Sequence, residues 1–224
     1  MRKPLRPKPL CVYCDAAPAM TRDHVVPQCL FNGKLTLDMV TVRVCKSCNA
    51  AKKADDEYLR DYLAIHEANF DHPVAKSLFE RMRRATRRNQ SEVARAVVAN
   101  TDFRPAYTAD GVPVGNIPFV PLDQDRMVRL FSRITRGLYF RLRHRRFPQD
   151  EMFAVNWIEQ READNIQRSL SAVGIGHYCL GDVFGCLHAY DEAEPSKTIW
   201  LQRYFNVWIL VRSAPAGSLL PGEF

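Results

Sequence analysis

The sequence of 224 residues lacks any apolar stretch near the roughly 20 residues that a membrane-spanning helix needs. Its longest apolar run, Val207–Val211, has only the length of a strand. The first ten residues are basic and proline-rich, without the apolar core of a secretory signal, so we expect a cytoplasmic protein with no membrane partner. Internal repeats and low-complexity segments are absent as well, and 46% hydrophobic with 25% charged residues excludes a disordered or fibrous chain.

Positive charge is in excess and is distributed unevenly. Lys and Arg total 32 against 25 Asp and Glu, which gives a net charge of +7. Residues 1–54 carry +7, residues 55–72 carry −5, residues 73–150 carry +9 and residues 151–224 carry −4. The two basic blocks predict a polyanionic partner for the first two-thirds of the chain. The alternative that charge alone leaves open is a solubilising surface.

Apolar periodicity predicts an α+β protein. Helical patterns cover residues 55–70, 73–88, 123–138 and 159–172, and strand patterns cover residues 184–190 and 204–211. Residues 101–121 contain four prolines and two glycines, so we expect an extended connection there.

Four of the seven cysteines form two Cys-x-x-Cys pairs, Cys11-x-x-Cys14 and Cys45-x-x-Cys48. Four thiolates complete a tetrahedral zinc site, and in a reducing compartment metal ligation is favoured over disulfides. The 30 residues between the pairs exceed the roughly 15–20 of the common zinc-ribbon pattern. We therefore predict a structural Zn²⁺ with an insertion between its two knuckles; buried cysteines or a disulfide framework are the alternatives. We expect the other three cysteines to be small core residues: Cys29, Cys179 and Cys186.

The insertion carries Asp23-His24, and Asn49 directly follows the second pair, with Lys52 three residues later. With these motifs in this order, residues 11–60 resemble an HNH endonuclease of the zinc-stapled kind. In that family an Asp-His pair ends a first strand, a second strand leads to the second Cys-x-x-Cys, and a His or Asn then begins a helix. The resemblance implies a zinc-stapled ββα-metal nuclease module over residues 1–70, followed by an α+β domain with helices and strands over residues 71–224.

The resemblance also implies roles for individual residues in the hydrolysis of DNA phosphodiester bonds. His24 is the general base, a task that suits a side chain titrating near neutral pH. Asp23 and Asn49 hold a catalytic divalent ion, and their oxygen atoms suit Mg²⁺ or Mn²⁺. Arg22, Lys52 and Lys53 are candidate phosphate contacts, with solvated surface charges as the alternative. Restriction or another form of phage defence is the role that the family suggests.

The chain departs from the family pattern in three places. A middle Asn is missing before the second Cys pair, where the sequence reads Asp38-Met39-Val40-Thr41. In the family that residue braces the loop that holds the base, so we expect Asp38 or Thr41 to substitute. The last motif position is Asn49 rather than His, which the family tolerates, and Lys53 stands where some members have a further His.

The resemblance extends to the segment Arg133-Ile134-Thr135-Arg136-Gly137-Leu138-Tyr139, which is similar to a helix that follows the nuclease module in some bacterial HNH proteins. Arg129, Arg133 and Arg136 form a basic stripe on this predicted helix, and they are candidate contacts to a phosphate backbone. An equally weighted alternative is a basic surface helix packed on the C-terminal sheet.

Two other functions are compatible with the sequence. The first is a non-catalytic zinc-binding adaptor for nucleic acid or protein, which the missing middle Asn favours. The second is a nuclease-derived chain whose cutting is held off by a regulatory partner subunit. For an active enzyme, a double-strand cut would need two active sites, hence a homodimer or two sequential nicks.

Overall fold

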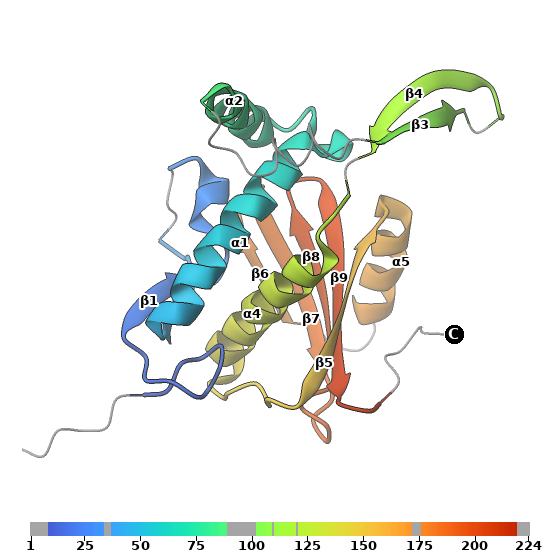
Figure 1. Ribbon diagram of the computed structural model, residues 1–224. Coiled ribbons are helices and arrows are strands. Elements are labelled where there is room, and N and C mark those ends of the chain that lie inside the picture. Colours follow the sequence, from blue (N-terminus) through green and yellow to red (C-terminus); the bar gives the residue numbers. More distant parts are fainter. Residues whose placement is uncertain are drawn as a thin grey trace, which may run out of the picture.

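The computed structural model describes residues 9–33, 37–88, 102–108, 110–119, 121–171 and 176–218. The chain is α+β, as the sequence predicts. Helices and strands follow the chain in the order β1, β2, α1, α2, β3, β4, α4, β5, α5, β6, β7, β8 and β9, as labelled in Figure 1. No helix among the described residues is long and apolar enough to span a membrane.

The N-terminal elements are two short strands and a long helix. β1 (Thr21–His24) pairs antiparallel with β2 (Thr41–Val44), and Asp23 lies opposite Val42. α1 (Lys46–Ile65) begins directly after β2. The prediction that this helix begins at residue 55 and runs to residue 70 was wrong at both ends. The first nine residues of α1 have no apolar stripe, and the helix instead begins at Cys45, whose sulfur accepts a hydrogen bond from the amide of Cys48.

The C-terminal elements build a five-stranded antiparallel sheet in the order β5-β9-β8-β7-β6. Its strands are β5 (Glu151–Ile158), β6 (Gly176–Leu180), β7 (Phe184–Tyr190), β8 (Thr198–Tyr204) and β9 (Val207–Pro215). The strand predicted over residues 204–211 is confirmed over residues 207–211 as the first part of β9, but its start was wrong, because Phe205 adopts a left-handed conformation with φ 55° in the turn between β8 and β9. The strand predicted over residues 184–190 is confirmed as β7.

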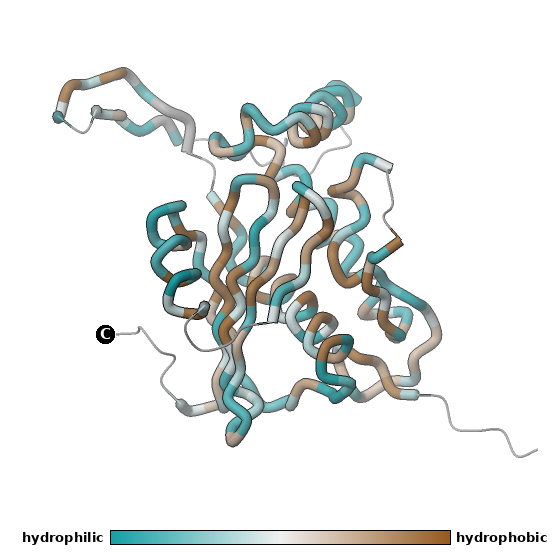
Figure 2. The backbone as a smooth tube through the Cα atoms, turned by 180° about the vertical axis from the view of Figure 1, so that it is seen from behind, coloured by the Kyte–Doolittle hydropathy of each residue, from teal (hydrophilic) through white to brown (hydrophobic). Residues whose placement is uncertain are grey.

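Helices cover both faces of this sheet. Trp200 and Leu201 are neighbours on β8 and so project to opposite faces. Trp200 belongs to the main hydrophobic cluster with residues of α1 and α4 (Gln124–Arg143), whereas Leu201 packs with Ala163 and Leu170 of α5 (Gln160–Ser171). Figure 1 shows α1 and α4 in front of the sheet, and Figure 2 views the opposite side.

Two further elements lie at the end of the molecule where α1 ends. α2 (Pro73–Arg87) packs against α1. β3 (Asp102–Tyr107) and β4 (Pro113–Phe119) pair as an antiparallel hairpin that projects from the body in Figure 1. The segment 101–121 was predicted to be an extended connection, and this hairpin corrects that prediction.

The main hydrophobic cluster is continuous from the N-terminal elements to the C-terminal sheet. It includes Val25 after β1, Leu59 of α1 and Phe131 of α4. Gly137 of α4 lies against Val25 so closely that a Cβ atom there would be 2.7 Å from a Val25 methyl carbon. A side chain at position 137 would therefore push α4 away from the end of β1. The division of the chain at residue 70 into two folding units stays a prediction.

Asp55 joins α1 to α4 through two buried ion pairs. Its side chain is 7% exposed and lies 2.8 Å from Arg133 and 3.3 Å from Arg126. Breaking a fully buried ion pair costs about 3–5 kcal/mol. The side chains of Arg126 and Arg133 are 16% and 18% exposed, so solvent weakens these two ion pairs. For Asp55→Asn we therefore expect a loss of about 2–3 kcal/mol in the free energy of unfolding.

Urea unfolding of wild type and variant measures this loss. The matched control is Asp125→Asn, which changes an exposed aspartate in the first turn of α4 and should alter stability by no more than about 0.5 kcal/mol. Equal destabilisation by the two substitutions would show that the pairing with α4 contributes nothing specific.

Candidate metal centre and active site

Four cysteines that are far apart in the sequence converge at the start of α1. The sulfur atoms of Cys11, Cys14, Cys45 and Cys48 all lie within 4.8 Å of one another, and Cys14 Sγ is 4.0 Å from Cys45 Sγ. A tetrahedral zinc with bonds of about 2.3 Å places its sulfur ligands about 3.8 Å apart. The cluster can therefore hold a metal ion such as zinc with little movement. This agrees with the predicted ligand set.

Local backbone geometry brings each cysteine pair into position. The first pair lies in a tight turn that is closed by hydrogen bonds from the Cys11 amide to Ala17 O and from the Asp15 amide to Cys11 O. The second pair spans the first turn of α1. Burial opposes ionisation of the Cys45 thiol, but hydrogen bonds from Ser47 and the Cys48 amide outweigh it and lower its pKa to about 6. A thiolate at this position is the form that binds a metal.

The three cysteines outside the cluster have different surroundings. Cys186 is buried, as predicted, and burial raises its pKa. Cys29 is half-buried, donates to the carbonyl of Asp56 at 3.4 Å, and has its pKa raised to about 12 by burial. Cys179 is exposed on β6, so the prediction that it is a core residue was wrong.

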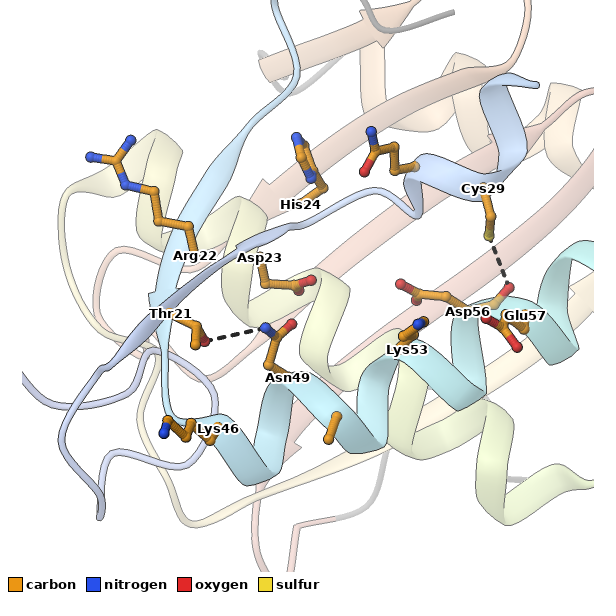
Figure 3. Close-up of a pocket in the computed structure, with 12 residues that line it drawn as sticks. Thr21, Arg22, Asp23, His24, Cys29, Lys46, Asn49, Lys53, Asp56 and Glu57 are labelled. Carbon is orange, nitrogen blue, oxygen red and sulfur yellow. Dashed lines mark hydrogen bonds between the residues drawn. The ribbon is translucent and has the colours of Figure 1, made fainter. Parts of the chain in front are cut away.

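An open hollow of about 530 Å³ lies between β1 and the first turns of α1. Its lining brings together the three predicted catalytic residues, Asp23, His24 and Asn49, with the basic residues Arg22 and Lys53 (Figure 3). Side chains alternate along a strand, so Thr21 and Asp23 share one face of β1. Asn49 lies in the first turn of α1, where the helix passes that face.

Asn49 and Asp23 lie next to each other, as Figure 3 shows. The Asn49 amide nitrogen donates to the hydroxyl of Thr21 at 3.2 Å, which leaves the amide oxygen of Asn49 as an acceptor. The hydroxyl of Tyr13 donates to Oδ2 of Asp23 at 2.6 Å. Burial and the nearby Asp23 carboxylate raise the pKa of Tyr13 well above its usual value, so Tyr13 remains a donor. The second oxygen of Asp23 has no hydrogen-bond partner within the described part of the chain.

Lys52 is the main correction to the predicted site. The sequence suggested a solvated side chain that contacts phosphate, but Lys52 is 0% exposed. Its ammonium donates to both carboxylate oxygens of Asp56, at 2.9 and 2.8 Å, and lies 3.4 Å from Oδ2 of Asp23. A buried ammonium with these partners has no surface on which a phosphate could bind. Lys53, one residue later, is exposed and lines the hollow.

Asp56 completes this buried group. Burial raises its pKa to about 7, against the opposing attraction of Lys52. When both carboxylates are ionised, Asp23, Lys52 and Asp56 together keep one negative charge, which suits a site for a cation. The contributions of Asp56, Tyr13 and Thr21 to the site were not predicted from the sequence. The spacing of four between Lys52 and Asp56 allows an ion pair on a helix surface, but Lys53 and Glu57 have the same spacing, so it did not single out the buried pair.

His24 is half-buried at the end of β1 and lines the hollow. Its imidazole has no hydrogen-bond partner in the described ranges, so it is available to solvent or a ligand. The predicted braces of its loop are Asp38 and Thr41, and neither side chain has a hydrogen bond to another described residue. Asp38 accepts at its main-chain oxygen from Tyr178. Thr41 lies opposite His24 in the β1–β2 ladder and is exposed.

Two of the three arginines predicted to contact nucleic acid from α4 are engaged inside the protein. Arg133 pairs with Asp55, and Arg136 donates to the carbonyl of Tyr13 at 2.8 Å and to Glu151 at 3.3 Å. These contacts correct the prediction for Arg133 and Arg136, because guanidinium groups held in this way tie α4 to its neighbours. Arg129 is exposed.

A comparison of the chain with protein-family models, with curated proteins and with solved structures found no match.

Proposed function

We propose that this chain is a metal-dependent endonuclease of the HNH type that hydrolyses DNA phosphodiester bonds. One observation carries the proposal: Asp23, His24 and Asn49 line one open hollow beside the four-cysteine cluster. Their side chains supply an imidazole base and two hard oxygen donors, which is the set that metal-assisted hydrolysis of a phosphodiester needs. Restriction or phage defence is the role that we propose for this activity, by analogy with the family that the motifs resemble.

The residues of the hollow fit a divalent ion of the Mg²⁺ or Mn²⁺ type. Tyr13 and Lys52 engage one oxygen of Asp23, and Thr21 engages the nitrogen of Asn49. One carboxylate oxygen and one amide oxygen remain as ligands, and both are of the kind these ions prefer. When bound, such an ion would polarise the scissile phosphate and neutralise charge on the leaving oxygen. His24 takes the proton from the attacking water.

Exposed cations at the rim of the hollow support a polyanionic substrate. Arg22, Lys46 and Lys53 are exposed and line it. Contacts from such side chains to phosphates position a nucleic acid without reading its sequence, and they make binding dependent on salt. We therefore propose DNA as the substrate with weak sequence preference, and RNA as the second candidate.

A plasmid-nicking assay tests the proposal. Purified protein that carries about one zinc per chain should convert supercoiled plasmid to the open circle with Mg²⁺ or Mn²⁺, and EDTA should stop the reaction. Mg²⁺ or Mn²⁺ is needed in addition to the zinc because hydrolysis depends on the oxygen ligands in the hollow, whereas the zinc ligands are all sulfur. A zinc-loaded preparation that cuts neither DNA nor RNA with any divalent ion would contradict the proposal.

The alternative function is a non-catalytic zinc-binding adaptor for nucleic acid or protein. The contacts of Tyr13 and Lys52 to Asp23 favour it, because a carboxylate that already has two partners is less available to a metal ion. Salt-dependent DNA binding without cutting would support the adaptor. Cutting that is lost only when a regulatory partner subunit is added would support a held-off nuclease.

A further inference from the structure

Lys52 places a charged group inside the protein at the point where β1 meets α1. Its ammonium donates to the main-chain oxygen of His24 at 3.0 Å, contacts both oxygens of Asp56, and lies 3.4 Å from Asp23. An ammonium has three N–H groups, and three residues face it here. Two of those residues, Asp23 and His24, are consecutive in the proposed active site.

We propose that Lys52 is a positioning residue for the nuclease reaction. Its ammonium holds the main chain of the proposed base, His24, and the carboxylate of the proposed metal ligand, Asp23, at a fixed place relative to α1. This inference rests on the proposed function. Asn49 and Lys52 are three residues apart and therefore lie on the same side of α1. One turn of a single helix thus carries both an oxygen ligand and the group that sets the base beside it.

Strand pairing alone does not hold His24 in this way. Within the described part of the chain, β1 pairs with β2 in a two-stranded sheet, and His24 is the last residue of β1. The side chains of Asp38 and of Thr41, the first residue of β2, bond to no other described residue. The bond from Lys52 to the carbonyl of His24 therefore ties the end of the strand to a 20-residue helix. Catalytic groups need such support, because a displacement of about 1 Å can lower a rate by about 10²-fold.

A buried ion pair is also weak evidence for a purely stabilising role. Replacing such a pair by apolar groups of similar size is often neutral or favourable for stability. In this protein the ammonium of Lys52 instead contacts residues of the proposed active site. A role in positioning that site explains why a lysine occupies this buried position, whereas a contribution to stability alone does not.

The test compares Lys52→Met with Asp55→Asn. Lys52→Met keeps most of the length of the side chain and removes every hydrogen bond of the ammonium. Asp55→Asn breaks ion pairs on the same helix, but Asp55 is not among the residues that line the hollow, so it is the control for lost stability. Lys76→Met, which changes an exposed lysine that does not line the hollow, is the control for lost positive charge. For each protein we would measure zinc content, Tm, DNA Kd and the single-turnover nicking rate at the same interval below its own Tm.

We expect Lys52→Met to lower the single-turnover rate by about 10²-fold with DNA Kd changed by no more than about twofold. Asp55→Asn should keep the rate within about fivefold of wild type, and Lys76→Met should have little effect on DNA binding or on the rate at saturation. Equal rate losses in Lys52→Met and Asp55→Asn, or a Lys52→Met chain that neither folds nor binds zinc, would make Lys52 a structural residue and overturn the proposal. Wild type that does not cut at all would instead refute the proposed function, and the positioning role with it.

Discussion

His24→Ala is expected to lower the rate of DNA nicking by about 10²–10⁴-fold, the usual contribution of a general base. Its zinc content, its DNA affinity and its free energy of unfolding should stay close to those of wild type. The imidazole is half-buried and bonds to no group in the described part of the chain, so its removal breaks no internal contact. The brace from Lys52 reaches the main chain of residue 24 and survives the substitution.

Nicking kinetics at saturating DNA, with thermal unfolding and metal analysis alongside, give the comparison. His177→Ala is the matched control, since His177 is exposed on β6 and is not among the residues that line the hollow. It should cut like wild type. If His24→Ala retains more than about a tenth of the wild-type rate, another group removes the proton and the assignment of His24 fails.

The candidate site was largely predictable because its main residues occur in short motifs. Each Cys-x-x-Cys pair is a local turn, and Asp23-His24 ends a strand whose partner leads into the second pair. Such motifs carry their own geometry: the side chains that must meet are held by one turn, one strand end or one helix start. The two Cys-x-x-Cys pairs predicted the four-cysteine cluster, and the resemblance to HNH endonucleases implied that Asp23 and Asn49 would lie together. The start of α1 was nevertheless predicted nine residues too late.

The burial of Lys52 was not predictable in this way. Lys52 and Lys53 are adjacent in the sequence of α1, and a lysine is rarely buried without a partner. Which of the two points inward depends on the direction of α1 relative to β1. That direction is set by residues far along the chain, because Gly137 of α4 fits against Val25 and Asp55 of α1 pairs with Arg133. Tertiary packing, not local pattern, therefore decided which lysine belongs to the site.

The strands of the C-terminal sheet show the same limit. β5, β6 and β8 were missed, and the start of β9 was misplaced by the turn at Phe205. In β8 and β9 the residues of both faces are apolar where two helix layers cover the sheet. In such a sheet the alternation of apolar and polar residues that marks a half-exposed strand is weak. The prediction that the arginines of α4 contact a phosphate backbone failed at two positions for a related reason. Arg133 and Arg136 form ion pairs with buried carboxylates of other elements.

Loss of the metal from the four-cysteine cluster is expected to have the largest effect on stability. Structural zinc in small modules contributes about 10–16 kcal/mol of apparent binding free energy, against a net stability of about 5–15 kcal/mol for a typical domain. Cys48→Ser should therefore abolish stoichiometric zinc, lower Tm strongly and eliminate nicking. Cys179→Ser is the matched control, because Cys179 is exposed and lies outside the cluster, and it should retain one zinc per chain and the wild-type Tm.

Hydrogen exchange on the metal-free protein would show how far the damage spreads. The hydrophobic cluster runs without a break from Val25 and Leu59 to Phe131 and the C-terminal sheet. We therefore expect amides of β1, β2 and α1 to lose protection first, and α4 to follow partially because Gly137 and Arg133 contact those elements. Full protection of the N-terminal elements in Cys48→Ser would mean that packing on α4 is sufficient and that the metal is dispensable. Exchange confined to residues before about 70 would instead support a separate N-terminal folding unit, with its own stability carried by the metal.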